Sequence, residues 1–279
     1  MKKILTLALV LTMVLSLFAG CGSAGKEKAI LKVAISPDFA PMEFVDPSKT
    51  GQDQYVGFDV FLAKYIAEEL GMELQIMPMD FQACQTAVAM GTVDMSISGF
   101  SWTAERAENY NLSDYYYAGD NETEQVLITV AANAGKYTTV DSLKGLKVGA
   151  QSASLQEALC KEQLPETSLV VFTDINTGVL QLKKGDFDVM AVATGNADAI
   201  INSNPDLALA GFNFEVTDEE SNNLILLKKG NDELTQKVNE ILAKAYAAGK
   251  YGEWYAAAEE LAGIGVEISY DENGNPITD

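Results

Sequence analysis

The chain has 279 residues with 40 acidic and 19 basic side chains and no histidine, so its formal net charge is −21. A surface this acidic repels nucleic acid and anionic lipid headgroups, which argues against both as binding partners. The absence of histidine excludes His-based triads, His metal ligands and His general bases. No phosphate loop or dinucleotide fingerprint is present, so we expect neither a metal nor a cofactor.

The first 20 residues have the pattern of a secretory signal. Two lysines precede an apolar stretch at residues 4–17, and small residues stand just before Cys21. The stretch is too short for a stable transmembrane span, and a buried anchor helix is the alternative. This end resembles a bacterial lipobox, although Phe18 stands where leucine is usual. The resemblance implies lipidation of Cys21, which would hold the chain to the membrane, and a tether at residues 21–28.

Strand and helix patterns alternate from residue 30 onward. In the first part of the chain, the patterns predict strands at residues 30–36, 73–78 and 93–98 and helices at residues 57–70 and 81–90. This βαβαβ order predicts a parallel sheet covered by helices.

The stretch Val93–Arg106 is the most informative one for function. It reads as a strand that ends at Gly99, a hydroxyl-rich turn, and a helix capped by Thr103. Arg106 then lies in the first helical turn, where the helix macrodipole disfavours a cation. A residue that breaks a local rule in this way often belongs to a site.

The same turn predicts a carboxylate site. The Gly99 backbone, the Ser101 hydroxyl and the guanidinium fork of Arg106 together suit a carboxylate ligand. The alternative is a surface helix on which Arg106 pairs with Glu105 or Asp114.

A second alternation follows an apolar run at residues 126–132. The patterns predict strands at 146–150, 169–172, 188–192 and 223–228 and helices at 154–162, 177–183, 195–201, 232–248 and 253–261. Two similar units in series favour two lobes over one large sheet. Cys84 and Cys160 fall in separate predicted helices, and we expect two unpaired thiols rather than a disulfide bridge.

Seven sequence blocks occur in an order typical of one family. They are Ser36–Phe44, Val56–Val60, Met79–Phe81, Val93–Arg106, Leu143–Gln151, Lys184–Val189 and Gly249–Trp254. Over about residues 29–258 the chain therefore resembles the extracytoplasmic (type II periplasmic) solute-binding proteins of amino-acid ABC importers, family 3, of the lipoprotein kind.

The resemblance implies an α/β fold of two lobes, each a mostly parallel sheet flanked by helices, joined by two hinge strands. On that template residues 29–118 plus 223–265 form lobe 1, residues 127–215 form lobe 2, and residues 266–279 form a C-terminal tail. Closure of the hinge around a ligand is the expected motion.

The resemblance also implies a function. We expect a monomer, periplasmic or anchored to the outer face of the bacterial cell membrane. It would bind an amino acid or a related small carboxylate between its lobes and deliver it to the permease of an ABC transporter. We expect no catalytic residue; a carboxylate-based dehydratase or a ligand sensor on the same fold is the alternative.

Residue roles follow from the resemblance position by position. Arg106 resembles the clamp on the ligand carboxylate, bound through both guanidinium nitrogens. The Gly99 carbonyl and the Ser101 hydroxyl resemble acceptors for the ligand ammonium. The Ser154 hydroxyl and the Leu155 N–H match positions that approach the carboxylate from lobe 2.

Three aromatic residues complete the expected site. Phe39 and Phe81 match the walls that sandwich a ligand, with ordinary core packing as the alternative. Trp102 is either a third wall or a staple for its helix.

The chain also departs from the family pattern. Ala193 stands where an aspartate usually neutralises the ligand ammonium, and a buried ammonium without a countercharge is costly. Either Asp120 or Glu122 turns inward to replace that aspartate, or the ligand lacks a normal free α-amino group. The run Gln151–Ser154 replaces a Gly-Thr pair and has less backbone freedom.

Overall fold

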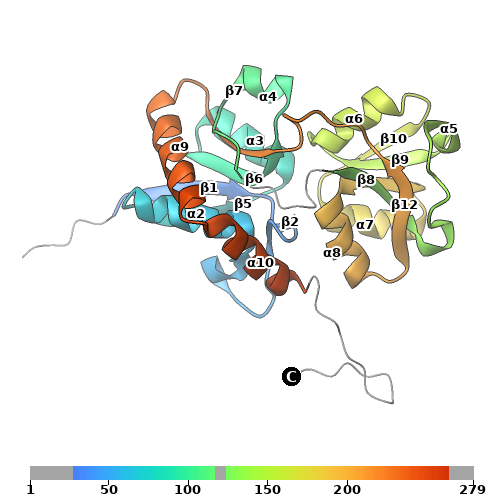
Figure 1. Cartoon of the computed structure of the whole chain (residues 1–279), viewed down its shortest axis with the longest axis horizontal. Helices are drawn as coiled ribbons and strands as arrows, with labels where there is room; N and C mark the ends of the chain where they lie inside the picture. Colours follow the sequence, from blue (N-terminus) through green and yellow to red (C-terminus); the bar gives the residue numbers. More distant parts are fainter. Residues whose placement is uncertain (1–27, 117–123, 264–279) are drawn as a thin grey trace, which may run out of the picture.

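The computed structural model describes residues 28–116 and 124–263, which form two lobes lying side by side (Figure 1). Each lobe is built on a five-stranded sheet. Cys21, the predicted signal and the predicted tail beyond Gly263 lie outside the described residues. None of the helices within the described ranges is long and apolar enough to cross a membrane.

The sheet of lobe 1 has the strand order β5-β1-β6-β13-β7. Its strands are β1 (Ile30–Ile35), β5 (Glu73–Pro78), β6 (Met95–Ser101), β7 (Tyr110–Leu112) and β13 (Asn223–Lys228). Strand β1 pairs in parallel with β5 and β6, whereas β13 runs antiparallel to β6 and β7. The chain therefore returns from the other lobe to place β13 inside the first sheet.

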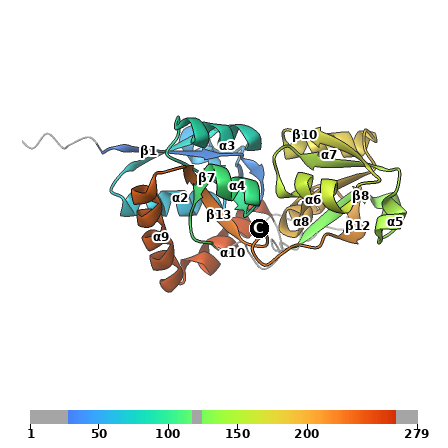
Figure 2. The ribbon, with the colours of Figure 1, turned by 90° about the horizontal axis from the view of Figure 1, so that it is seen from above.

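Helices cover both faces of this sheet. They are α2 (Phe58–Glu69), α3 (Phe81–Met90), α4 (Ala104–Asn109), α9 (Asp232–Ala247) and α10 (Lys250–Ala262). The apolar sides of α2, α9 and α10 share one core with the sheet, and α3 packs in a second core on the opposite face (Figure 2). A small sheet of β2 (Asp38–Phe39), β3 (Glu43–Val45) and β4 (Tyr55–Val56) lies between β1 and α2 in sequence.

The sheet of lobe 2 has the strand order β10-β9-β11-β8-β12. Its strands are β8 (Gln125–Val130), β9 (Lys147–Gln151), β10 (Ser168–Phe172), β11 (Val189–Ala193) and β12 (Leu207–Asn213). Its helices are α5 (Val140–Leu143), α6 (Leu155–Gln163), α7 (Ile175–Lys184) and α8 (Thr194–Ser203). Side chains of α6 pack in one core, and those of α7 and α8 pack in another. The predicted α/β class and the two-lobed arrangement are thus confirmed.

The sequence prediction was wrong about where β6 ends. The strand does not stop at Gly99 but continues to Ser101, which pairs with Asn223 of β13. The pairing shifts register between Leu224 and Leu226, and Gly99 has a φ of +55°. Glycine tolerates that backbone angle, so the strand bulges there instead of ending.

The two cysteines lie far apart in the fold, one in each lobe. Cys84 is buried in the core under α3, Cys160 is buried in the core under α6, and both are free. The expectation of two unpaired thiols agrees with this arrangement.

Helix α2 begins in direct contact with the backbone of the small sheet. The Phe58 and Asp59 amides donate to the Pro41 and Met42 carbonyls at 3.1 and 2.8 Å. Gly57 precedes them with a φ of +119°, and a Cβ there would stand 2.3 Å from the Met42 oxygen. Only glycine permits this approach, which holds the β2–β3 segment against the lobe.

We expect Gly57→Ala to lower the free energy of unfolding by about 3 kcal/mol or more, because it adds a backbone clash to an unfavourable φ. Gly51→Ala is the matched control, since Gly51 has a φ of +65° but no atom within 4 Å of its virtual Cβ. That variant should lose only about 1 kcal/mol. Urea denaturation followed by fluorescence measures both, and equal losses would contradict the contact argument.

Candidate functional site

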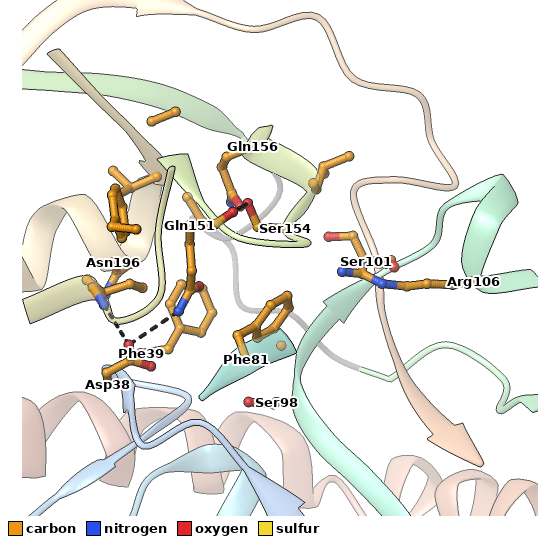
Figure 3. Close-up of a pocket in the computed structure, with 17 residues that line it drawn as sticks. Asp38, Phe39, Phe81, Ser98, Ser101, Arg106, Gln151, Ser154, Gln156 and Asn196 are labelled. Atoms are coloured by element: carbon orange, nitrogen blue, oxygen red, sulfur yellow. Dashed lines mark hydrogen bonds between the residues drawn. The ribbon is translucent and has the colours of Figure 1, made fainter. Parts of the chain in front are cut away.

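A cavity with about 500 Å³ of empty space lies between the two lobes (Figure 3). Lobe 1 contributes β2, the end of β6, α3 and α4, and lobe 2 contributes the β9–α6 turn, β11, α7 and α8. The lining residues are Asp38, Phe39, Phe81, Ser98, Gly99, Ser101, Arg106, Gln151, Ser154, Leu155, Gln156, Phe172, Ile175, Ala191, Val192, Ala193 and Asn196.

Arg106 is the only arginine in the sequence, and it is 3% exposed. Thr103 caps α4 as predicted, with its hydroxyl accepting the Arg106 amide at 3.2 Å. This cap sets the first turn of α4 so that the guanidinium reaches into the cavity (Figure 3). The predicted placement of Arg106 in the first helical turn is confirmed.

Within the described residues, the hydrogen bonds of the Arg106 guanidinium are all accepted by neutral oxygens. Its Nη1 donates to the Ser101 carbonyl at 2.6 Å, its Nη2 to the Ala153 carbonyl at 2.9 Å and its Nε to Gln85 Oε1 at 3.4 Å. No carboxylate of the described residues forms an ion pair with it. The alternative of a surface helix with an exposed ion pair is therefore wrong, because Arg106 is buried.

Aromatic rings add to the surroundings of the guanidinium. Its carbon lies 5.5 Å from the Phe81 ring centroid and 5.2 Å from the Phe100 centroid. Burial lowers the pKa of Arg106 to about 10. At neutral pH the side chain thus remains a buried cation, stabilised by ring faces and carbonyl dipoles.

The first turn of α6 faces the same cavity from lobe 2. Ser154 is the N-cap, and its hydroxyl accepts the Glu157 amide at 3.0 Å and donates to the Gln151 carbonyl at 2.7 Å. Leu155 is the first helical residue, where an amide N–H has no partner within the helix. An arginine and a helix N-terminus that meet at one cavity are the arrangement that attracts a carboxylate.

The turn before α6 also connects the lobes. Ala153 has a φ of +59°, and its carbonyl accepts both Arg106 Nη2 and Gln85 Nε2, the latter at 3.1 Å. A left-handed alanine is unfavourable by about 1 kcal/mol. The Ala153 amide, which donates to Glu157 Oε2 at 2.6 Å, helps to hold the turn. The run at Gln151–Ser154 therefore adopts a left-handed backbone at Ala153 without a glycine.

The predicted aromatic residues separate into two groups. Phe39 and Phe81 line the cavity, and Phe39 packs so close to Gly99 that a Cβ on the glycine would stand 2.7 Å from the ring. Trp102 is not among the lining residues and packs against the core under α3 with Tyr110. All the other predicted ligand-binding residues line the cavity.

Two buried carboxyl groups lie beneath the lobe 1 side of the cavity. Glu43 accepts a short hydrogen bond from the Ser98 hydroxyl, and Asp59 Oδ2 accepts the Gly99 amide at 2.8 Å and the Tyr116 hydroxyl at 3.0 Å. Both side chains are 0% exposed. The pair thus holds the floor of the cavity at Ser98 and Gly99.

Burial is the main reason why neither group ionises readily. It raises the pKa of Asp59 to about 7 and, together with repulsion from Asp59, raises the pKa of Glu43 well above its usual value. Two carboxylates buried side by side cannot both carry a charge at low cost.

Ala193 ends β11 and lines the cavity, so the position where an acid was missing is part of the site. Asp120 and Glu122, the proposed substitutes, lie outside the described residues. The described lining contains one carboxylate, Asp38, which the sequence analysis did not select. Its place directly before Phe39 in a family-like block was the available signal.

Comparisons with known proteins agree with this geometry. The profile of the bacterial extracellular solute-binding proteins, family 3, matches residues 31–257. The arginine-binding extracellular protein ArtP of Bacillus subtilis is 34% identical over 253 residues, which cover 87% of this chain and 92% of ArtP. The ABC transporter glutamine-binding protein GlnH of the same organism is 27% identical and covers 91% of this chain and 96% of GlnH.

A solved structure shows the same architecture. It is the amino acid ABC transporter substrate-binding protein AbpA from Streptococcus pneumoniae bound to L-arginine. The two chains are 35% identical with a TM-score of 0.77, over 84% of this chain and 96% of AbpA.

We expect the protein without ligand to lose stability as the pH rises from 5 to 8. In the folded chain Glu43 and Asp59 keep protons that they lose in the unfolded chain above their ordinary pKa values near 4. The unfolded state then binds fewer protons, so the free energy of unfolding falls by up to about 1.4 kcal/mol per pH unit and group.

Glu43→Gln tests whether the buried carboxyl pair causes this pH dependence, because an amide stays neutral at every pH. Urea denaturation at each pH should give a weaker pH dependence for this variant. Glu162→Gln, which removes an exposed charge, is the control and should keep the slope of the unaltered protein. An unchanged slope in Glu43→Gln would show that the pair is ionised in the folded state.

Proposed function

Because the chain belongs to the bacterial extracellular solute-binding proteins, family 3, and binds an amino acid for an ABC transporter, we propose that Arg106 holds the carboxylate of that amino acid. One observation carries this proposal: Arg106 is a buried cation with no carboxylate partner among the described residues. A buried charge is stable only when it is paired, and a ligand carboxylate supplies the pair.

Lobe 2 also supports the binding of a ligand carboxylate beside Arg106. Leu155, the first residue of α6, lines the cavity from lobe 2, so a carboxylate near its amide would meet donors from both lobes. Phe39 and Phe81 then flank the rest of the ligand, and the Gly99 carbonyl and Ser101 hydroxyl accept from its amine. Binding in this way ties the lobes together and favours the closed arrangement over an open one.

Arginine is the first ligand to test. ArtP is named as an arginine-binding protein, and AbpA was solved with L-arginine bound. We propose a basic amino acid as the class, since the cavity also holds the carboxylate of Asp38.

We also propose that the mature protein is a monomer attached through a lipid on Cys21 to the outer face of the cell membrane. The lipobox-like Phe18–Cys21 run and the tether predicted after it support this placement. A tether lets the two lobes reach the permease while the chain stays at the membrane.

We expect Arg106→Gln to weaken arginine binding by about 30-fold or more, because the ligand carboxylate loses a buried charged partner. Calorimetry measures the affinity, and thermal unfolding checks that the variant folds. Lys144→Gln, which removes an exposed cation of lobe 2, is the control and should bind normally.

The sole arginine also permits a direct readout. Labelling the protein with ¹⁵N-arginine gives one Nε–H signal, that of Arg106. Saturation with unlabelled arginine should shift this signal. An unmoved signal together with unchanged affinity in Arg106→Gln would show that Arg106 has only a structural role.

A further inference from the structure

Two charged side chains line the cavity within the described residues, and they lie on opposite sides of it. Arg106 approaches from α4, and Asp38 approaches from β2, with Phe39 and Phe81 between them (Figure 3). A ligand that satisfies both charges must carry its own opposite charges at separated ends.

Asp38 accepts hydrogen bonds from neutral donors. The Ser36 hydroxyl donates to its Oδ1 at 2.9 Å, the Ile175 amide donates to its Oδ2 at 2.7 Å, and Gln151 Nε2 lies 3.3 Å from Oδ2. A carboxylate has about four acceptor positions, so one position on Oδ1 remains for a further donor. No lysine or arginine of the described residues forms an ion pair with Asp38.

The amine end of an ordinary amino acid meets a different environment. Beside the carboxylate site the lining offers Ser101, Gly99 and the methyl group of Ala193, none of which is charged. The hydrogen bonds of the amine to these neutral acceptors lack the attraction of an opposite charge, so they contribute less to binding than a close buried charge pair does. The charge that matters most for affinity should therefore be the one that reaches Asp38.

We propose that the cavity selects its ligand by a positive charge at the end far from the carboxylate, that Asp38 receives this distal cation, and that the α-amine contributes little. This inference rests on the proposed role of Arg106, which fixes the position of the carboxylate. The fitting class comprises basic amino acids and the corresponding ω-guanidino and ω-amino acids without an α-amine.

Asp38 also joins the lobes, because Ile175 and Gln151 belong to lobe 2. If it were only a latch between the lobes, its charge would influence every ligand equally. If it receives a cation, its charge matters only for ligands that carry a distal cation. The two roles therefore predict different results for charged and uncharged ligands of the same shape.

The ligand test compares L-arginine with two close analogues by calorimetry. L-Citrulline has the same length and an uncharged end, and 5-guanidinopentanoate has the charged end but no α-amine. We expect citrulline to bind about 30-fold or more weakly than arginine, and 5-guanidinopentanoate to bind within about tenfold of arginine. Lysine, norleucine and 6-aminohexanoate form a second series with the same expectations.

The variant test uses Asp38→Asn, which removes the charge but keeps a carbonyl oxygen able to accept the Ile175 amide. It should weaken arginine binding by about 30-fold or more and reduce the preference for arginine over citrulline to a few-fold. Asp80→Asn is the matched control: it removes an acid that caps α3, outside the cavity lining, and asparagine caps equally well. This control should keep the preference.

Three results would overturn the proposal. The first is tight binding of citrulline, the second is a loss far above tenfold for 5-guanidinopentanoate, and the third is an equal loss for both ligands in Asp38→Asn. In each case Arg106→Gln would still weaken arginine binding by about 30-fold or more if the carboxylate clamp is right. Normal binding to Arg106→Gln would instead refute the clamp itself.

Discussion

The rest of this structure depends on one constraint, the burial of the Arg106 guanidinium. Among the described residues, its contacts are neutral oxygens and the faces of aromatic rings. Arg106 is held by carbonyls of both lobes and by two phenylalanine rings, and burial has lowered its pKa to about 10 without removing its charge. Carbonyl dipoles and rings stabilise a cation only in part. In the proposed function, the ligand carboxylate supplies the charged partner that this guanidinium lacks among the described residues.

The arrangement of the acidic side chains protects that site. The chain is strongly acidic, yet no carboxyl group of the described residues forms an ion pair with Arg106. Glu43 and Asp59 lie beneath the floor, where burial raises their pKa values, and they serve to position Ser98 and Gly99. Asp38 lies across the cavity, beyond the aromatic walls. A carboxylate close to Arg106 would neutralise it and compete with the ligand.

Closure and recognition use the same atoms. The Ala153 carbonyl of lobe 2 accepts from Arg106, and Asp38 of lobe 1 accepts the Ile175 amide at the start of α7. The groups proposed to contact the two ends of the ligand are therefore also the groups that cross between the lobes. A ligand that engages them changes the balance between open and closed arrangements directly, by its differential contacts in the two states.

The sequence alone determined the order of the main strands and helices, the two-lobed α/β class and the helix capped by Thr103, because hydrophobic periodicity, glycine stops and side-chain caps are local signals. It did not predict the small sheet, β7 or β12. It also singled out Arg106, since a cation in a first helical turn is unfavourable locally. Tertiary structure decided the rest. The bulge that carries β6 past Gly99 depends on pairing with β13, which comes more than a hundred residues later. Contacts between distant segments decide the burial of Arg106, the packing of Trp102 against the core and the approach of Asp38 to Ile175. No local pattern encodes those contacts, because their free energy arises only when the chain has brought the segments together.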